Sequence, residues 1–403
     1  MPEYPLKDIR VMNFGWYWAG PVSGHLLGDM GADLITIESR KHITGTRFLA
    51  PFMHNRTDDV NYNFWAHNLY RSGLSLTLNL GNSKAKELFK EMISVSDVLI
   101  ENFALGTLDR LGIGYQDLRK INPSLVVLSL SGAGQNGVLS HVPILGSSLG
   151  SLAGIDSLQG YAGELPTSPG TAVPDAINGV IGAFAVLAGL RERQRTGKGQ
   201  QIDISQWEAL TATIGAPLLD YWFNRRGYTP IGNRDAAMAP HGVYPCRHAD
   251  SWVAIAVKTQ EEWQRFCRAL GSPEWAHSPA FADPFRRLRN QDQLDARIQE
   301  WTRTRTNYEA TTLLQANGVA AFPSLGSKEL FEDSHFLARE SWVQIEHALG
   351  PETVYGIHWK LSETPGLVKP NHPLGTDNRS VYGTLLGHNL QDYATLEGEQ
   401  VFF

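Results

Sequence analysis

The segment that decides the fold class is DIRVMNFGWYWAGPVSGHLLGDMGADLITIES, residues 8–39. Strand-forming residues over 8–14 lead into a turn that contains Gly15, Gly20 and Pro21, then into apolar residues at helical spacing, and finally into a second strand over 32–39. Two more strands are expected near 95–102 and 123–132, with a helix between them. Because strands that alternate with helices form parallel βαβ units, the sequence predicts an α/β fold with a parallel sheet.

A change in sequence character near residue 225 indicates a second domain. Upstream, a long apolar helix is expected over 176–194, followed by a glycine turn and another strand. From about Gly227 the chain has a loop-and-hairpin pattern and then helices rich in Trp and Arg. A chain of 403 residues also suits two domains of ordinary size. We therefore expect a large α/β domain over 1–224 and a smaller α+β domain over 225–335.

Composition excludes several classes of protein. A net charge of −6 argues against a general nucleic-acid binder, since no excess of Lys and Arg is available for phosphates. The N-terminus has no secretion-signal pattern, and no apolar run was expected to span a bilayer. The two cysteines form no CxxC pair, and the 13 histidines include no HExxH, so no metal site is expected. These features favour a cytoplasmic enzyme or binding protein without membrane or nucleic-acid partners.

The turn after the first strand is a candidate binding site for phosphate or carboxylate, because free backbone N–H groups point outwards at a helix N-terminus. A plain tight turn is the alternative. A nicotinamide site is a further alternative, since Glu38 ends the second strand where a ribose-binding acid would lie. The spacing of Gly15, Gly20 and Gly24 does not match GxGxxG, which disfavours a dehydrogenase.

Asp175 is the candidate nucleophile. It lies in TSPGTAVPDAINGV, residues 167–180, directly after Pro174 and before the long apolar helix. An ordinary N-cap or first-turn aspartate is one interpretation. The other is catalytic: a helix N-terminus is expected to keep the carboxylate ionised, and an ionised carboxylate can attack an acyl carbonyl.

An ordered set of motifs resembles the family III CoA-transferases, which include formyl-CoA transferase, carnitine CoA-transferase and the related α-methylacyl-CoA racemases. The resemblance covers nearly the whole chain. The segments that carry it are WAGPVSGHLLGDMGADLITIES (18–39), ENFALGTLDRLGIGYQDLRKINPSLVVLSLSGAGQNG (101–137), PDAINGVIGAFAVLAGLRERQRTGKGQQIDIS (174–205), HGVYPCRHADSWVAIAV (241–257), GVAAFPSLGSKELFEDSHFLARE (318–340) and LSETPG (361–366).

The resemblance implies roles for eight residues. Asp175 falls on the family's catalytic aspartate. Arg47 falls on an arginine that holds the coenzyme A (CoA) phosphates, and Arg110 on the arginine of an RLG motif. The full set of positions implied for CoA binding is Tyr17, Trp18, Ala19, Arg47, Asn102, Phe103 and Arg110. For Phe103 core packing stays open as an alternative, and for Arg110 a solvated helix face.

The resemblance also implies an architecture and a reaction. The large domain would be Rossmann-like, the segment 336–403 would return to it, and two ring-like chains would interlock as a homodimer or as a hetero-oligomer with a related subunit. Asp175 would form an aspartyl-CoA thioester, with CoA thioesters as substrates, no permanently bound cofactor and no metal. Succinyl-CoA is the expected donor and an aromatic dicarboxylate such as benzylsuccinate the expected acceptor.

Two departures from the family pattern affect function. Leu145 and its neighbours in VPILGSSLGSLAG (142–154) include no His, and racemisation needs a second acid–base group, so a racemase or isomerase is disfavoured. The segment AAMAPHG (236–242) replaces a run of consecutive glycines in formyl-CoA transferase, which argues against formate or oxalate. A non-catalytic CoA-binding subunit stays open, although the presence of Asp175 argues against it.

Overall fold

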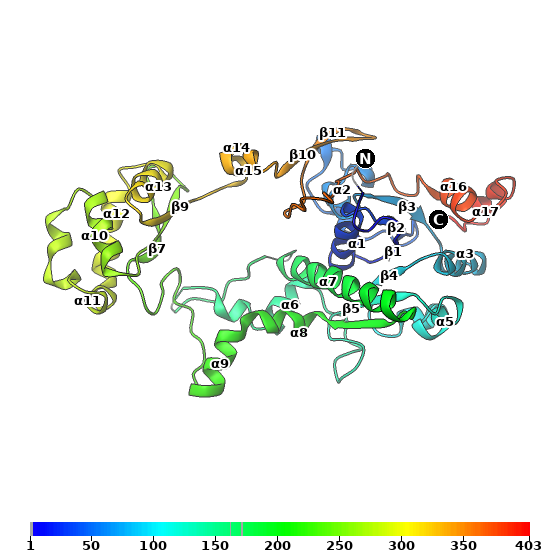
Figure 1. The fold of residues 1–403 in the computed structure, drawn as a ribbon, viewed down its shortest axis with the longest axis horizontal. Helices are drawn as coiled ribbons and strands as arrows, with labels where there is room; N and C mark the ends of the chain where they lie inside the picture. The colour runs from blue at the N-terminus through cyan, green and yellow to red at the C-terminus, as the bar shows by residue number, and fades with distance from the viewer. Residues whose placement is uncertain (1–2, 162, 171) are drawn as a thin grey trace. The chain divides into compact units, whose positions relative to one another are not determined.

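Six parallel strands in the order β3-β2-β1-β4-β5-β6 form the central sheet (Figure 1). The computed structural model describes residues 3–161, 163–170 and 172–403. The strands are β1 (Arg10–Phe14), β2 (Asp33–Glu38), β3 (Gly73–Thr77), β4 (Val98–Glu101), β5 (Val126–Ser131) and β6 (Gln201–Ser205). The predicted α/β fold with a parallel sheet is confirmed. The order reverses between β1 and β4, which is where open sheets of this kind bind ligands.

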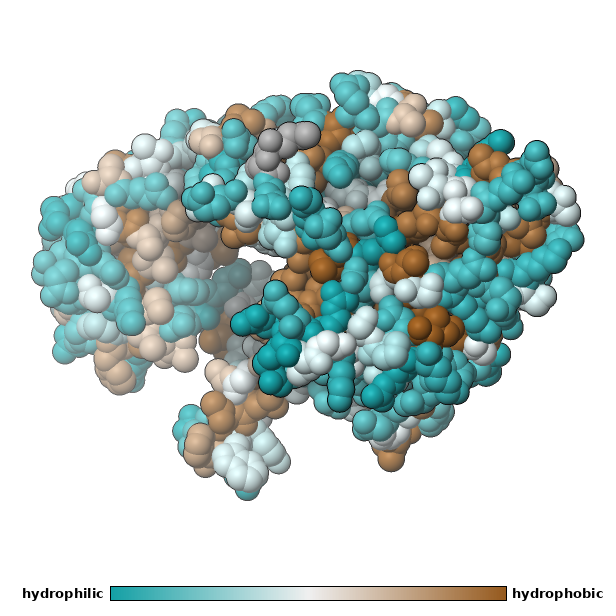
Figure 2. All heavy atoms as spheres, turned by 45° about the vertical axis from the view of Figure 1, so that its right-hand side comes forward, coloured by the Kyte–Doolittle hydropathy of each residue, from teal (hydrophilic) through white to brown (hydrophobic). Residues whose placement is uncertain are grey.

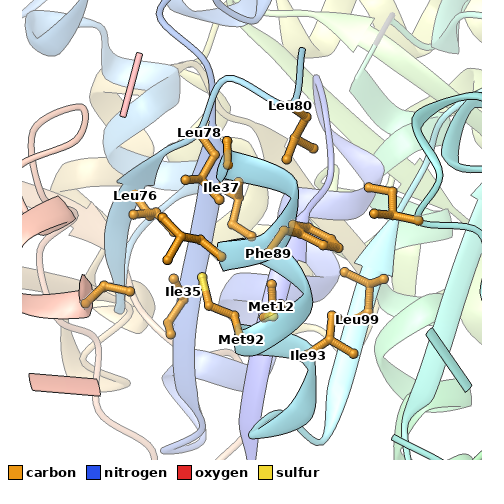
Figure 3. Close-up of a cluster of buried hydrophobic side chains, with 14 of the residues drawn as sticks. Met12, Ile35, Ile37, Leu76, Leu78, Leu80, Phe89, Met92, Ile93 and Leu99 are labelled. Atoms are coloured by element: carbon orange, nitrogen blue, oxygen red, sulfur yellow. The ribbon is translucent and has the colours of Figure 1, made fainter. Parts of the chain in front are cut away.

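Helices cover both faces of the sheet. Successive strand residues point to opposite faces, so neighbouring residues of β1 pack in different cores. Val11 packs in a core with α1 (Ala19–Asp29), α2 (Phe64–Leu69) and α7 (Ala172–Thr196). The next residue, Met12, packs in a core with α3 (Ser83–Ser94) and α5 (Tyr115–Ile121). Figure 3 shows the second core, in which Phe89 and Met92 of α3 lie against Ile35 and Ile37 of β2. The large unit is therefore a three-layer α/β structure.

Small residues allow α1 and α7 to pack closely. A Cβ atom added to Gly179 of α7 would lie 2.5 Å from Val22 of α1, so only glycine fits there. The Ser23 hydroxyl donates a hydrogen bond of 2.7 Å to the Gly179 carbonyl oxygen across this contact. The start of α7 is thereby held beside the loop that precedes α1.

By length and composition α7 could also cross a membrane, contrary to the expectation that no segment could. Part of the helix is buried: Ala183 and Val186 pack in the core formed with β5 and α1. Burial of this kind is what a core helix of a globular protein shows, and core helices also meet the length and composition criteria for a membrane span.

The chain divides into two units. The large unit consists of Met1–Asp156, Ser168–Gly227 and Leu337–Phe403, and the small unit consists of Ser157–Thr167 and Tyr228–Phe336. In the small unit an antiparallel sheet and its helices enclose a separate core. These elements are β7 (His241–Pro245), β8 (Trp252–Ala256), β9 (Ala320–Ser324), α10 (Gln260–Ala269), α11 (Pro284–Arg289), α12 (Gln291–Thr302), α13 (Asn307–Ala316) and α14 (Ser327–Glu332).

The C-terminal segment covers the β3 edge of the sheet. Asp377 accepts a hydrogen bond of 2.8 Å from the Ser75 backbone N–H, and Asn378 accepts one of 2.8 Å from the Thr77 N–H. The remaining elements of the chain are α4 (Thr107–Leu111), α6 (Gly146–Leu152), α8 (Gln206–Thr211), α9 (Gly215–Asn224), α15 (Ser334–Ala338), β10 (Trp342–His347), β11 (Gly350–Tyr355), α16 (Asn378–Ser380) and α17 (Tyr393–Gly398). Residues after 336 thus complete the unit that the N-terminal strands begin.

Candidate active site

A cavity of about 300 Å³ in the large unit lies at the carboxyl ends of the strands. Segments that directly follow β1, β4, β5 and β6 contribute to its wall, as expected for a site at the reversal of the strand order. The wall consists of Trp16, Tyr17, Trp18, Leu49, Asn102, Phe103, Ala104, Ser131, Gly132, Ser140, Val142–Ser147, Asp175 and Gln206. Among these described residues, Asp175 is the only charged one. Five of the eight predicted site residues therefore line one cavity.

Asn102 holds the loop after β1 in place. Its side-chain oxygen accepts a hydrogen bond of 2.6 Å from the Trp16 N–H, and its side-chain nitrogen donates one of 2.7 Å to the Trp16 carbonyl oxygen. The two strands that precede these residues are neighbours, with Phe14 opposite Glu101. The sheet register thus brings together two predicted site segments that lie 86 residues apart in the sequence.

The loop after β1 has a strained backbone and an aromatic surface. Tyr17 has a φ of 57°, an uncommon value for a residue that is not glycine. The Trp16 and Phe103 rings lie 5.8 Å apart, and Trp18 lies 4.6 Å from Trp65 of α2. These aromatic contacts and the two hydrogen bonds between Asn102 and Trp16 together stabilise one conformation of the loop that lines the cavity.

Asp175 lies in the first turn of α7, three residues inside the helix start rather than before the helix as the sequence pattern suggested. The side chain is half-buried and makes no hydrogen bond within the described part of the chain. Burial raises the pKa of its carboxyl to about 6 from the ordinary value of 3.8. Desolvation disfavours the charged form and no donor among the described residues compensates, yet a pKa of about 6 still leaves this carboxyl mostly ionised at neutral pH.

The other three predicted residues lie outside the wall of this cavity. Ala19 is buried as the first residue of α1. Arg47 is fully buried and pairs with Glu38 through two hydrogen bonds of 2.7 and 2.6 Å. This pair also occupies the acid that a nicotinamide ribose would need, which counts against a dehydrogenase. Arg110 is exposed and donates to the Thr107 hydroxyl at 2.9 Å.

A second cavity of about 290 Å³ shares Trp16 and Phe103 with the first. Lys41, a cation just after β2, belongs to its wall and was missed in the sequence analysis. Ser131 and Gln206 of the first cavity were missed as well. The signal that could have found all three is their position at or shortly after the carboxyl ends of parallel strands.

Within the residues that the structure describes, no group of three or more His, Cys, Asp or Glu side chains could hold a metal ion. Asp175 lies among described wall residues that are otherwise uncharged. The arrangement can therefore present a single carboxylate to a bound molecule from a desolvated position.

The family model for CoA-transferase family III matches residues 6–378. The chain belongs to CoA-transferase family III. It is 32% identical to the succinyl-CoA–D-citramalate CoA-transferase of Chloroflexus aurantiacus, over 99% of this chain and 98% of that protein. It is 32% identical to the beta subunit of the succinyl-CoA–L-malate CoA-transferase of the same organism, over 95% of this chain and 94% of that protein. A CAIB/BAIF family protein from Brucella suis shares the fold with a TM-score of 0.88 and 26% identity, over 95% of this chain and 99% of that one.

This CoA-transferase is therefore an enzyme that uses CoA thioesters and carboxylic acids as substrates. The predicted family and enzyme class are confirmed.

Proposed function

We propose that this CoA-transferase moves CoA from succinyl-CoA to a small dicarboxylic acid, with Asp175 as the covalent nucleophile. The observation that carries the proposal is Asp175 as the only charged described group in the wall of the cavity formed at the strand ends. Two relatives that cover nearly the whole chain are succinyl-CoA-dependent enzymes, which supports the same donor here.

In the proposed reaction, the Asp175 carboxylate attacks the thioester carbonyl of succinyl-CoA and releases the CoA thiolate, leaving a mixed anhydride. The thiolate then attacks the aspartyl carbonyl of the anhydride, which forms an aspartyl-CoA thioester and releases succinate. The acceptor carboxylate attacks this thioester to give a second anhydride and free thiolate. Attack of the thiolate on the acceptor's carbonyl forms the new acyl-CoA and regenerates Asp175.

A pKa of about 6 suits this chemistry. At neutral pH most Asp175 carboxyls are ionised and able to attack, yet the poorly solvated anion is more basic than an exposed aspartate. The N–H groups of Gly15, Trp16 and Tyr17 already donate to Asn13, Asn102 and Thr44. Among the described residues of this loop, the N–H groups of Trp18 and Ala19 have no acceptor, which makes them the candidate donors to the developing oxyanion.

For CoA binding we propose that Asn102 and Phe103 flank the pantetheine arm and that the second cavity receives the nucleotide end. Lys41 in that cavity could supply a positive charge for a phosphate. Tyr17, Trp18 and Ala19 would face the thioester. Arg110 is exposed and able to reach phosphate, whereas Arg47 would have to leave Glu38 to do so.

The aromatic residues in the wall also support an aromatic acceptor such as benzylsuccinate, which therefore belongs in the acceptor screen. A racemase or isomerase is less well supported, because the described residues of the wall include no second carboxylate and no His, Lys or Cys side chain.

We further propose that the enzyme acts as a homodimer or with a related subunit. Hydrophobic residues reach the surface of the chain in several places (Figure 2). In α7 and α9 they include Phe184, Trp222 and Phe223, which are 72%, 67% and 73% exposed. Large exposed apolar residues on two helices are typical of a subunit interface. The L-malate enzyme has alpha and beta subunits, which supports the hetero-oligomeric alternative.

The test is mass spectrometry of the protein after it is mixed with succinyl-CoA and quenched with hydroxylamine or borohydride. We expect modification at Asp175 in the wild type and none in Asp175→Ala. Asp220→Ala, which removes a partly exposed aspartate of α9, is the matched control and should be modified like the wild type. Full transferase activity in Asp175→Ala would refute the mechanism.

A further inference from the structure

Two polar atoms in the wall of the Asp175 cavity are buried without a hydrogen-bond partner. They are the hydroxyl oxygen of Ser131 and the side-chain oxygen of Gln206. The two residues are only 3% and 5% exposed. Because native proteins pair almost all buried polar atoms, unpaired ones at a site indicate a place for a ligand group.

The sheet places these two residues side by side. In the pairing of β5 with β6, Ser131 lies opposite Ser205, and Gln206 is the next residue. The two strand ends stay in contact one residue further along, because the Trp207 N–H donates a hydrogen bond of 3.0 Å to the Gly132 carbonyl oxygen. Ser131 and Gln206 therefore reach the cavity from adjacent strand ends.

A second contact determines which end of the Gln206 amide is free. Its nitrogen donates a hydrogen bond of 2.8 Å to the Leu130 carbonyl oxygen. A carbonyl oxygen can only accept, so the amide nitrogen must face Leu130 and the amide oxygen must be the unpaired atom. The site thus combines an acceptor, the Gln206 oxygen, with the Ser131 hydroxyl, which can donate.

This pair is complementary to a hydroxyl group, which both donates and accepts one hydrogen bond. We propose that Ser131 and Gln206 bind a hydroxyl of the acid substrate, so that this enzyme selects hydroxy acids over their deoxy analogues. The Gln206 oxygen accepts a hydrogen bond from the substrate's hydroxyl, and the Ser131 hydroxyl donates one to the substrate's hydroxyl oxygen. The inference rests on the proposed CoA transfer and identifies the class of acid.

The test compares acids that differ only in the hydroxyl, such as citramalate with methylsuccinate and 2-hydroxyglutarate with glutarate, with succinyl-CoA as donor. The measured quantity is the ratio of kcat/KM for the hydroxy acid to kcat/KM for its deoxy analogue. We expect a wild-type ratio of at least about 10, since a site built to bind a hydroxyl is left with unpaired buried groups by the analogue. In Gln206→Met and in Ser131→Ala the ratio should fall about tenfold.

Using a ratio removes the effect of partial misfolding, because both acids meet the same protein sample. The matched control is Gln291→Met, which removes another buried glutamine with an unpaired amide atom, in the small unit. It should leave the ratio unchanged.

Three results would overturn the inference. A wild-type ratio near one means that the hydroxyl is not recognised, while CoA transfer itself still supports the proposed function. An equal loss for both acids in the variants, with the ratio unchanged, assigns Ser131 and Gln206 to CoA binding or to structure. The absence of CoA transfer to any acid would refute the proposed function and the hydroxyl site together.

Discussion

Replacing Asp175 by Asn should stabilise the protein at pH 8 and should do so progressively less as the pH falls. Burial raises the pKa of this carboxyl from 3.8 to about 6, so the folded protein binds its proton more tightly than the unfolded chain does. Above pH 6 the folded state therefore carries the full cost of a poorly solvated charge. The difference between the two pKa values corresponds to about 3 kcal/mol.

The pH window follows from the same two values. As the pH falls through 6 towards 3.8, the folded protein takes up the proton first, and the cost disappears. At pH 5 about 1.5 kcal/mol of it remains. The advantage of Asp175→Asn in free energy of unfolding should therefore shrink by about half between pH 8 and pH 5. Any constant effect of the asparagine itself cancels in this comparison.

Urea denaturation of wild type and variant at the two pH values measures the effect. Asp117→Asn is the control, because Asp117 is exposed and its hydrogen bond with Lys120 lowers the pKa of its carboxyl. That variant should show no gain in stability at pH 8. An Asp175→Asn advantage that stays constant with pH, or grows as the pH falls, would refute the argument that burial raises this pKa.

Three further predictions concern the reaction, the buried charges and the cysteines. The kcat/KM for CoA transfer should rise with pH through about 6 as Asp175 ionises, and a rate that falls over that interval would contradict a carboxylate nucleophile. Arg71→Met removes the guanidinium that lies 2.7 Å from the Asp29 carboxylate and leaves this carboxylate buried without its ionic partner. The free energy of unfolding, measured by urea denaturation, should fall by about 3–5 kcal/mol. The control is Arg195→Met at an exposed ion pair, which should change the free energy of unfolding by less than about 1 kcal/mol. Burial raises the pKa of the Cys267 thiol to about 11 and also raises that of Cys246, so iodoacetamide at pH 8 should label both cysteines quickly only after denaturation, as read by intact mass.

The geometry of the site explains why much of it could be predicted. Tyr17 and Asn102 were predicted from the family resemblance. Each follows a strand, and parallel strands bring their carboxyl ends to one edge of the sheet. Asp175 was identified from a helix start and from the family resemblance. The sequence pattern could not reveal how far solvent is removed from that carboxyl, so the rise of its pKa to about 6 became apparent only in the folded structure.

The sequence also did not show which buried polar groups pair with one another. Arg47 was expected to hold phosphate, yet it lies fully buried against Glu38. The two residues are only nine positions apart, but nothing in their spacing shows that the folded chain closes over both. Ser131 and Gln206 were missed for a related reason, since their free atoms become apparent only when the β5–β6 register is known.

The sequence by itself determined the alternation of strands and helices, the parallel sheet and the family, and it predicted the position of the nucleophile. Local periodicity specifies which face of each element is apolar, and that is enough to define the strands, the helices and the sheet, whereas the ordered motifs indicate the family and Asp175. Only the tertiary structure decided that Ser157–Thr167 belongs to the small unit and that Asp377 pairs with Ser75, 302 residues away. Such choices depend on which distant surfaces fit together and on how much water they exclude, and no single segment encodes either quantity.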